Sequence, residues 1–171
     1  MKYLKIKTIA AAAFVTLASL SSANATVVAT CPDPVPADRY MTFSATGVTC
    51  LDSGTYSGGP GNGSEDQFLS TFSTYTLIGK SDATGTDPLT LGLTAASGSL
   101  IAGTTGTLDW TAPGGYSSYA VLFKFGQGTV QDAWFAFLLP STSGFSAANW
   151  ATYNPDGTRY TQHALSHASL F

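Results

Sequence analysis

The stretch "SYAVLFKFGQ" (118–127), followed by "DAWFAFLLP" (132–140), decides the fold class of this chain. Both runs are apolar almost throughout and rich in aromatic residues, a composition that favours buried β-strands. The "GQGT" between them (126–129) indicates a tight hairpin. We therefore predict that these two runs pair with each other as the central strands of a sheet.

Shorter strand-like runs lie on either side of this hairpin, and turn clusters separate them at fairly even spacing. In "RYMTFSATGVTC" (39–50), side chains of alternate residues fall on opposite faces at period 2. Such spacing is typical of a sandwich or barrel. We predict a single all-β domain, a jelly-roll-like antiparallel β-sandwich of about eight to ten strands. The other predicted strands are 74–81, 89–96, 106–112, 149–154 and 163–171.

A glycine-rich stretch, "LDSGTYSGGPGNGSEDQ" (51–67), interrupts the pattern and is predicted to be a loop inside the domain. Its end opens a segment with one apolar face, "SEDQFLSTF" (64–72). Ser64 and Gln67 have the spacing of a capping box, and the acids between them suit the first turn of a helix. We predict one short helix of one or two turns here.

The first 25 residues have the pattern of a secretory signal peptide. Three lysines precede an apolar run from Ile9 to about Leu20, and the small-x-small triplet Ala23-Asn24-Ala25 follows. The apolar run is too short for a membrane span, which needs about 20 residues. We predict cleavage after Ala25, a single domain over 26–171, and no transmembrane segment in that domain. The chain is thus expected to be secreted or to reside at the cell surface.

The charge of the predicted mature chain excludes two classes of partner. Removal of the three N-terminal lysines leaves four Lys and Arg residues against ten Asp and Glu, a net charge of −6. Binding to nucleic acid requires clustered cations that neutralise phosphates. Four scattered cations cannot form such a cluster, and the same argument excludes an anionic membrane surface.

Two cysteines, Cys31 and Cys50, remain after cleavage. An even number of cysteines in an exported chain indicates a disulfide. The closed loop of about 20 residues would contribute about 3 kcal/mol in the chain-entropy account. We predict a structural Cys31–Cys50 bridge rather than a metal site or a catalytic thiol.

Residue types that could support catalysis are scarce. His163 and His167 are four residues apart in a predicted strand, a span of about 13 Å, so they cannot share one zinc ion. No G-x-S-x-G motif is present to mark a nucleophilic serine. A single Glu gives no sign of paired glycosidase carboxylates. We predict a non-catalytic chain without a cofactor.

Calcium is the one metal for which a weak pattern exists. Asn62, Glu65 and Asp66 lie beside glycine-rich backbone, and calcium prefers carboxylate, amide and carbonyl oxygens. Asp52 could add a fourth ligand. The acids do not alternate as in an EF-hand, and helix capping by Ser64 already explains the same residues. A calcium site is therefore the less favoured interpretation.

Three Trp, eight Tyr and ten Phe are many for this length, and most of them must fill the core of a sandwich. Trp110, beside an acid, and Tyr116 with Tyr119, after "PGG", are the aromatics most expected to be exposed. Exposed aromatic rings can stack on sugars, so these three are the candidate sugar-stacking residues; core packing is the favoured alternative. The predicted core is Phe43, Leu77, Leu91, Leu93, Val121, Phe123, Phe125, Phe135, Phe137 and Leu139.

The order of four motifs resembles a known class of exported proteins. These motifs are "YTLIGKSD" (75–82), "YAVLFKFG" (119–126), "AWFAFLL" (133–139) and "ALSHASLF" (164–171). They are similar to the β-sandwich domain of PEP-CTERM proteins, which exosortase sorts to the surface of exopolysaccharide-producing Gram-negative bacteria. That class continues with a linker, Pro-Glu-Pro, a membrane helix and a basic cluster. None of these follows the last predicted strand, so exosortase sorting is not carried over.

The resemblance implies an extracellular setting rich in polysaccharide, and it supplies no catalytic residues. We expect a non-catalytic protein of the cell envelope or extracellular matrix, structural or adhesive, with polysaccharide or envelope and matrix proteins as partners. The alternative is a carbohydrate-binding module that stacks exopolysaccharide on exposed aromatics. A small secreted hydrolase is the least favoured function.

Overall fold

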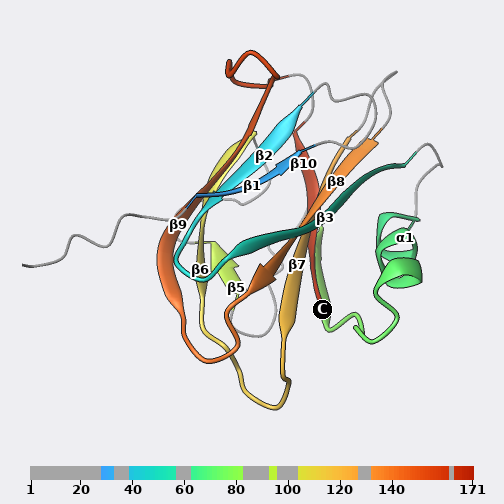
Figure 1. Ribbon diagram of the computed structural model, residues 1–171, viewed down its shortest axis with the longest axis vertical. Helices are drawn as coiled ribbons and strands as arrows, with labels where there is room; N and C mark the ends of the chain where they lie inside the picture. Colours follow the sequence, from blue (N-terminus) through green and yellow to red (C-terminus); the bar gives the residue numbers. More distant parts are fainter. Residues whose placement is uncertain are drawn as a thin grey trace, which may run out of the picture.

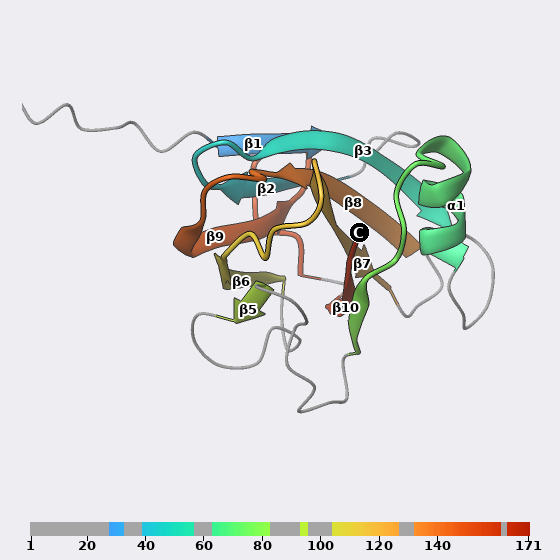
Figure 2. The same ribbon diagram turned by 90° about the horizontal axis from the view of Figure 1, so that it is seen from below.

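The computed structural model describes residues 28–32, 39–56, 63–82, 93–95, 104–126, 132–161 and 164–171. These residues form ten strands and one helix, arranged as two five-stranded antiparallel sheets packed face to face (Figures 1 and 2). The predicted β-sandwich with one short helix is confirmed. The predicted signal peptide lies outside the described residues. Within the described ranges, no helix has the length and hydrophobicity that a membrane span requires.

The first sheet, sheet A, has the strand order β1-β2-β9-β6-β5. Its strand β9 is central and pairs with β2 on one side and β6 on the other. Because these three strands come from distant parts of the chain, their register is decided by tertiary packing. The strands are β1 (Val28–Pro32), β2 (Tyr40–Ser44), β9 (Phe145–Tyr153), β6 (Thr105–Trp110) and β5 (Leu93–Ala95).

The second sheet, sheet B, has the strand order β3-β8-β7-β10-β4. The two runs that decided the fold class become β7 and β8, paired from Tyr119↔Leu139 to Phe125↔Ala133, so the predicted hairpin is confirmed. The predicted turn residues 127–129 lie outside the described residues. The strands are β3 (Thr49–Tyr56), β8 (Asp132–Leu139), β7 (Tyr119–Phe125), β10 (Leu165–Leu170) and β4 (Gly79–Asp82).

The main core lies between the two sheets and is built mainly from aromatic side chains. Phe43 of β2 meets Phe123 and Phe137 of the opposite sheet edge to face, at centroid distances of 5.8 and 5.5 Å. Eight of the ten predicted core residues take part in the two hydrophobic clusters, seven of them in this one. Leu77 is half-buried and packs under the helix, while Leu91 and the side chain of Leu93 are outside the description.

A second hydrophobic cluster lies on the outer face of sheet B, beneath helix α1 (Gly63–Thr71). Figures 1 and 2 show α1 on the side of the molecule away from β9. Phe68 of the helix is fully buried against Trp134 of β8 and Phe171 at the chain end. The helix was predicted, but its capping box is wrong: the helix begins at Gly63, and Ser64 bonds the Glu65 side chain instead.

Several boundaries differ from the prediction. Strand β3 runs through Tyr56, into the stretch predicted to be a loop, because pairing with β8 outweighs the low strand propensity of Asp52 and Gly54. Strand β1 was not predicted, since "VATCP" alternates weakly, but it pairs with β2. In the predicted strand 74–81, only the residues from Gly79 onward pair with β10.

The predicted disulfide is confirmed: Cys31 of β1 is bonded to Cys50 of β3, with the two Cα atoms 5.2 Å apart. These strands are edge strands of different sheets, so the bridge ties the sheets together on one side of the sandwich. The Ser53 hydroxyl adds a hydrogen bond to the carbonyl of Pro32 across the same junction. Figure 2 shows β1 and β3 running side by side there.

Candidate functional site

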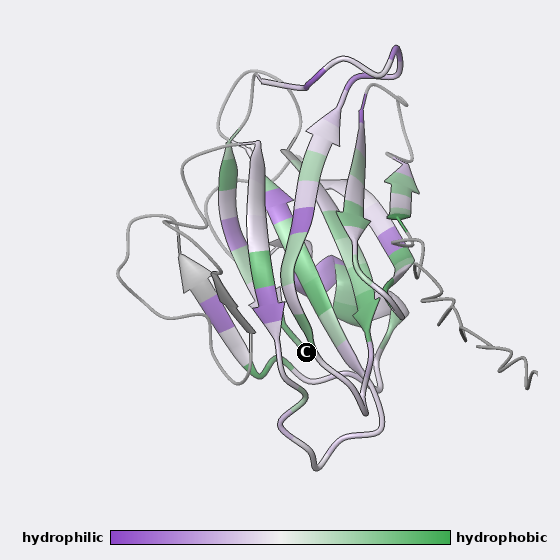
Figure 3. Ribbon diagram, turned by 90° about the vertical axis from the view of Figure 1, so that its left-hand side faces the viewer, coloured by the Kyte–Doolittle hydropathy of each residue, from purple (hydrophilic) through white to green (hydrophobic). Residues whose placement is uncertain are grey.

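A groove of about 500 Å³ lies on the outer face of sheet A, over strands β1, β2, β9 and β6. Figure 3 views the molecule from the side of this sheet. Most of the groove side chains are short and polar, and they come from strands that are adjacent only in the folded molecule. The lining residues are Val28, Thr42, Ser44, Thr105, Gly106, Thr107, Asn149, Trp150, Ala151, Tyr153 and Arg159.

The strand register explains why polar groups gather there. Ser44, Asn149 and Thr107 form one row across β2, β9 and β6, because Asn149 is the partner of both other residues. The neighbouring row on the same face is Thr42, Ala151 and Thr105. Because the side chain of the central Ala151 is small, the floor of the groove is low at this point. The residues between these rows point inward and belong to the core.

Tyr153 lines the groove at one end, and Tyr40, which is not part of the lining, stacks on its ring. Tyr40 and Tyr153 are cross-strand partners in β2 and β9, and their rings stack at a centroid distance of 5.2 Å with an interplanar angle of 14°. The guanidinium carbon of Arg159 lies 4.6 Å from the centroid of the Tyr153 ring. The ring of Tyr153 is thus contacted by Tyr40 and by Arg159, and this end of the groove is lined by one tyrosine and one cation.

A tight turn after β9 positions Arg159. The backbone N–H of Asn154 donates to the carbonyl of Thr158 (2.8 Å), and Arg159 forms a single antiparallel bridge with Tyr153. The Asp156 carboxylate accepts hydrogen bonds from the N–H (2.9 Å) and hydroxyl (2.7 Å) of Thr158. Those hydrogen bonds lower the pKa of Asp156, so the turn keeps its carboxylate ionised.

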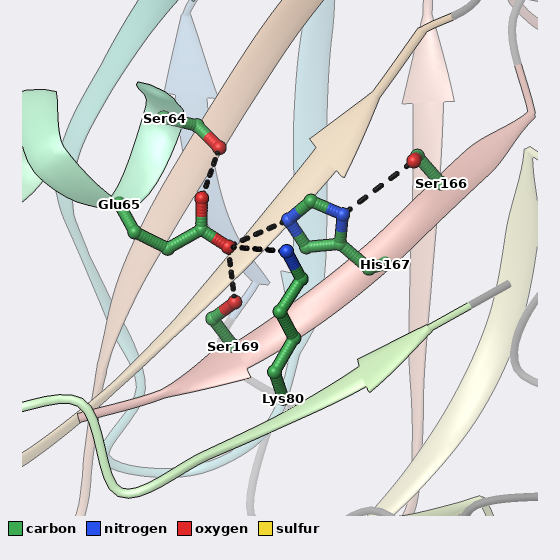
Figure 4. A network of polar contacts seen from close by, with 6 residues as sticks. All are labelled: Ser64, Glu65, Lys80, Ser166, His167 and Ser169. Atoms are coloured by element: carbon green, nitrogen blue, oxygen red, sulfur yellow. Dashed lines mark hydrogen bonds and ion pairs between the residues drawn. The ribbon is translucent and has the colours of Figure 1, made fainter. Parts of the chain in front are cut away.

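A second polar feature is buried under α1 and centres on Glu65, whose side chain is 1% exposed (Figure 4). Oε1 accepts a hydrogen bond from Ser169 (2.7 Å) and lies 2.7 Å from His167 Nε2 and 3.4 Å from Lys80 Nζ. Oε2 accepts a hydrogen bond from Ser64 (2.8 Å). The His167 contact has ion-pair distance without the direction of a hydrogen bond. Glu65 thereby joins the helix to β4 and β10.

The environment of Glu65 determines its ionisation. Burial of the carboxyl raises its pKa, since charge is costly away from water. The close contact with His167, the hydrogen bonds from Ser169 and Ser64, and the charge of His167 outweigh that effect and hold the pKa well below its usual range. The carboxylate is therefore ionised across the neutral and mildly acidic range.

The contacts around His167 do not make an accessible catalytic triad. Ser169 donates to Glu65, so the acid and not the imidazole lies between Ser169 and His167. Ser166 Oγ lies 3.5 Å from His167 Nδ1, at the limit of a hydrogen bond. Because His167 is 4% and Glu65 1% exposed, a substrate carbonyl has no route to the pair. This network favours a structural role.

The structure places the predicted sugar-stacking residues differently from expectation. Trp110 is 1% and Tyr119 0% exposed, so their predicted exposure is wrong. Both are packed against each other at 5.0 Å, with the Trp110 N–H bonded to the carbonyl of Pro140 and the Tyr119 hydroxyl to that of Gly114. Trp110 and Tyr119 can be buried in the core because each has one polar group, and that group has a hydrogen-bond partner. Tyr116 is 56% exposed, as predicted.

The predicted calcium ligands are not assembled into a site in the described residues. Asn62 and His163 lie outside those residues. Glu65 faces hydrogen-bond donors and cationic side chains rather than other oxygen ligands, while Asp66 is exposed. Groups of three or more Asp, Glu, His or Cys suited to a metal ion are missing from the described ranges. Glu65 is thus an internal ion-pair partner of Lys80 and His167.

Sequence reasoning missed the groove, although a signal for it exists. Thr42 and Ser44, and likewise Thr105 and Thr107, are polar residues two positions apart in strands. That spacing puts each pair on one face of a sheet. Whether these two pairs come together depends on the pairing of both strands with β9. Strand β9 follows β2 by about a hundred residues, so no local pattern contains that information.

The chain matches no protein-family model, no curated protein and no solved structure.

Proposed function

We propose that this chain is a non-catalytic, exported protein of the cell envelope or extracellular matrix that acts by holding polysaccharide in the groove on sheet A. The observation that carries the proposal is the row-by-row arrangement of Thr, Ser and Asn side chains over β2, β9 and β6. Retention of a glycan would give the protein a structural or adhesive role in a matrix.

The groups lining the groove suit a sugar better than an apolar ligand. Thr and Ser hydroxyls both donate and accept hydrogen bonds, and the Asn149 amide offers two donors and an acceptor. A sugar ring carries hydroxyls in the same density and needs such bidirectional partners. Tyr153 is half-buried and adds a phenol hydroxyl, which can donate and accept hydrogen bonds with a sugar.

Two further features support an extracellular setting. The Cys31–Cys50 disulfide belongs to an oxidising compartment. The N-terminal residues 1–25 have the pattern of a secretory signal peptide. The resemblance to PEP-CTERM proteins points to the same surroundings, and we keep it as part of the proposal. A hydrolase is less well supported, since His167 and Glu65 are buried away from the groove.

Affinity electrophoresis tests the proposal directly. Purified protein spanning residues 26–171, with its disulfide formed, is run through gels that contain bacterial exopolysaccharides, with calcium and with EDTA. We expect retardation by at least one polymer. Ala151→Phe, which fills the floor of the groove, and Asn149→Ala should both reduce it, while thermal stability confirms that each variant folds.

Tyr116→Ala is the matched control, because Tyr116 is exposed but does not line the groove. Loss of retardation in Tyr116→Ala with full binding by Ala151→Phe would move the glycan site to the tyrosine. A wild-type protein that passes unretarded through every polymer would contradict glycan binding. Retardation that requires calcium would show that a metal contributes to binding.

A further inference from the structure

We propose that the groove selects acidic polysaccharides and that Arg159 binds a carboxylate of the sugar. The inference rests on the proposed glycan-binding function and adds the chemical class of the ligand. It starts from the distribution of charge over the molecule.

Arg159 is the only charged side chain among the residues that line the groove. Most of the lining is neutral, and none of it is a carboxylate, in a chain that has ten acids and a net charge of −3. A groove without acids on an acidic protein does not repel an anion at close range. Arg159 supplies the one positive charge of the lining, which can attract an anion at short range.

The other cations of the domain are committed elsewhere. Arg39 is 3% exposed with its guanidinium over the Tyr160 ring, and Lys124 is 6% exposed. Lys80 forms the ion pair with Glu65. Among the residues that the structure describes, Arg159 is thus the only exposed Lys or Arg, and it lies at the groove.

The charge of Arg159 is not neutralised within the described part of the chain. No carboxylate there forms an ion pair with it, and its side-chain contact is the Tyr153 ring. The cation–π contact with the Tyr153 ring restrains the position of the guanidinium, which has five N–H groups as donors. Those N–H groups form a planar fork that matches a carboxylate through two parallel hydrogen bonds.

The neighbouring side chains complete the site for a uronic-acid residue. With the carboxylate on Arg159, the sugar ring lies beside Tyr153, and its hydroxyls face Thr42 and Thr105 on either side of Ala151. The contact is a single ion pair and not a basic patch. Binding should therefore weaken only modestly with added salt, unlike ion exchange on clustered cations.

The test compares polygalacturonate with the same polymer after methyl esterification of its carboxyl groups, in EDTA, by affinity electrophoresis and calorimetry. We expect wild-type protein to bind the acidic polymer about ten-fold more tightly, the value for one charge-assisted hydrogen-bonding contact. Arg159→Gln should bind both polymers equally, at the level of the ester. Arg159→Lys keeps the charge without the fork and should recover only part of the preference.

Dextran sulfate separates carboxylate recognition from general attraction to anions. Equal binding of dextran sulfate and polygalacturonate, both lost in Arg159→Gln, would overturn selection of carboxylates. An unchanged preference in Arg159→Gln would overturn the role of Arg159. Wild-type binding to the ester at the same strength as to the acid would overturn acid selectivity while leaving glycan binding intact. If the protein binds neither of these polymers and no other glycan, the proposed function and this inference are both overturned.

Discussion

At the scale of single residues, the molecule depends on a few side chains whose surroundings reverse their usual behaviour. Glu65 is an acid near the start of a helix, a position that normally suggests a solvated charge. Here it is buried, and four donors or cations from three elements surround it. Gly54 and Gly106 lie in strands, and the indole rings of Trp134 and Trp150 occupy the space that a side chain at these positions would take.

Replacement of Glu65 should be costly. Glu65→Gln leaves His167 and Lys80 without their buried anionic partner, and breaking such a pair costs about 3 kcal/mol. Urea unfolding at neutral pH measures the loss. Asp66→Asn is the control: this neighbour is exposed, and its substitution should change stability by less than about 0.5 kcal/mol. Equal effects of the two substitutions would contradict the role of Glu65.

The same carboxylate predicts a pH dependence. Its pKa is lower in the folded protein than in the unfolded chain, so the folded state is stabilised above about pH 4.3, the ordinary value for Glu. That stabilisation is lost as the pH falls below this value toward the depressed pKa. The difference in unfolding free energy between wild type and Glu65→Gln should therefore shrink as pH is lowered from about 5 to about 2. A difference independent of pH would argue against this linkage.

Gly106 predicts a steric effect. A Cβ at this position would lie 2.6 Å from Nε1 of Trp150, its cross-strand partner in β9. Because Trp150 is packed against Phe123 and Phe125, it cannot move aside freely, and Gly106→Ala should cost about 1–3 kcal/mol. Thermal denaturation measures this. Gly114→Asn is the control, since Gly114 has open space around it and a φ of +78° that Asn tolerates.

At the scale of elements, the helix and the disulfide each stabilise a region that strand pairing does not. The helix covers one face of a sheet, and the disulfide joins two edge strands. The helix α1 covers the outer face of sheet B and binds the last strand through Glu65 and Phe68. The disulfide joins the edge strands β1 and β3. Strand β1 has only one paired neighbour, and on its other side the disulfide and the Ser53–Pro32 hydrogen bond hold it to β3.

Removal of the disulfide should destabilise the protein without unfolding it. In Cys31→Ser/Cys50→Ser, the lost cross-link closes a separation of 19 residues, and we expect a loss of about 2–4 kcal/mol. Chemical denaturation provides the measurement. Reductant should lower the stability of the wild type by a similar amount and leave the double variant unchanged. An effect of reductant on the double variant would show that the reagent acts elsewhere.

At the scale of the whole molecule, two hydrophobic clusters lie on opposite faces of sheet B. The inner cluster includes Phe123, Phe135 and Trp150, and the outer cluster is centred on Phe68 and Trp134. Sheet B is therefore covered on both faces where β7 and β8 run, whereas the outer face of sheet A carries the polar groove. Because of this asymmetry we expect sheet B to be the more rigid half of the protein, and the outer face of sheet A is where we propose that a ligand binds.

Hydrogen exchange should report that asymmetry. Amides of β7 and β8 should exchange most slowly, near the rate set by global unfolding, since both faces of these strands are buried. Amides of α1 should exchange faster, because the helix can leave sheet B without opening the inner cluster. Mass spectrometry of peptides measures this. Protection of α1 equal to that of β7 would instead show that the two clusters unfold as one unit.

The sequence alone determined the features that depend on residues close together in the chain. The apolar runs at 118–127 and 132–140 were bound to form strands, since their pattern persists over whole segments. The fold class followed from the spacing of turns, and the disulfide from the presence of only two cysteines. The strand ends were less predictable, because pairing with β8 outweighed local propensity at Asp52 and Gly54.

Only the tertiary structure decided the groove and the Glu65 network. Tyr40 meets Tyr153, and Glu65 meets Ser169, across about a hundred residues of chain. A change of one residue in register would turn Thr42 and Asn149 toward the core. The same register buried Trp110 and Tyr119 and left Arg159 at the surface. Local patterns predict which residues of one strand share a face. Packing between strands that are distant in the chain decides which of these faces come together.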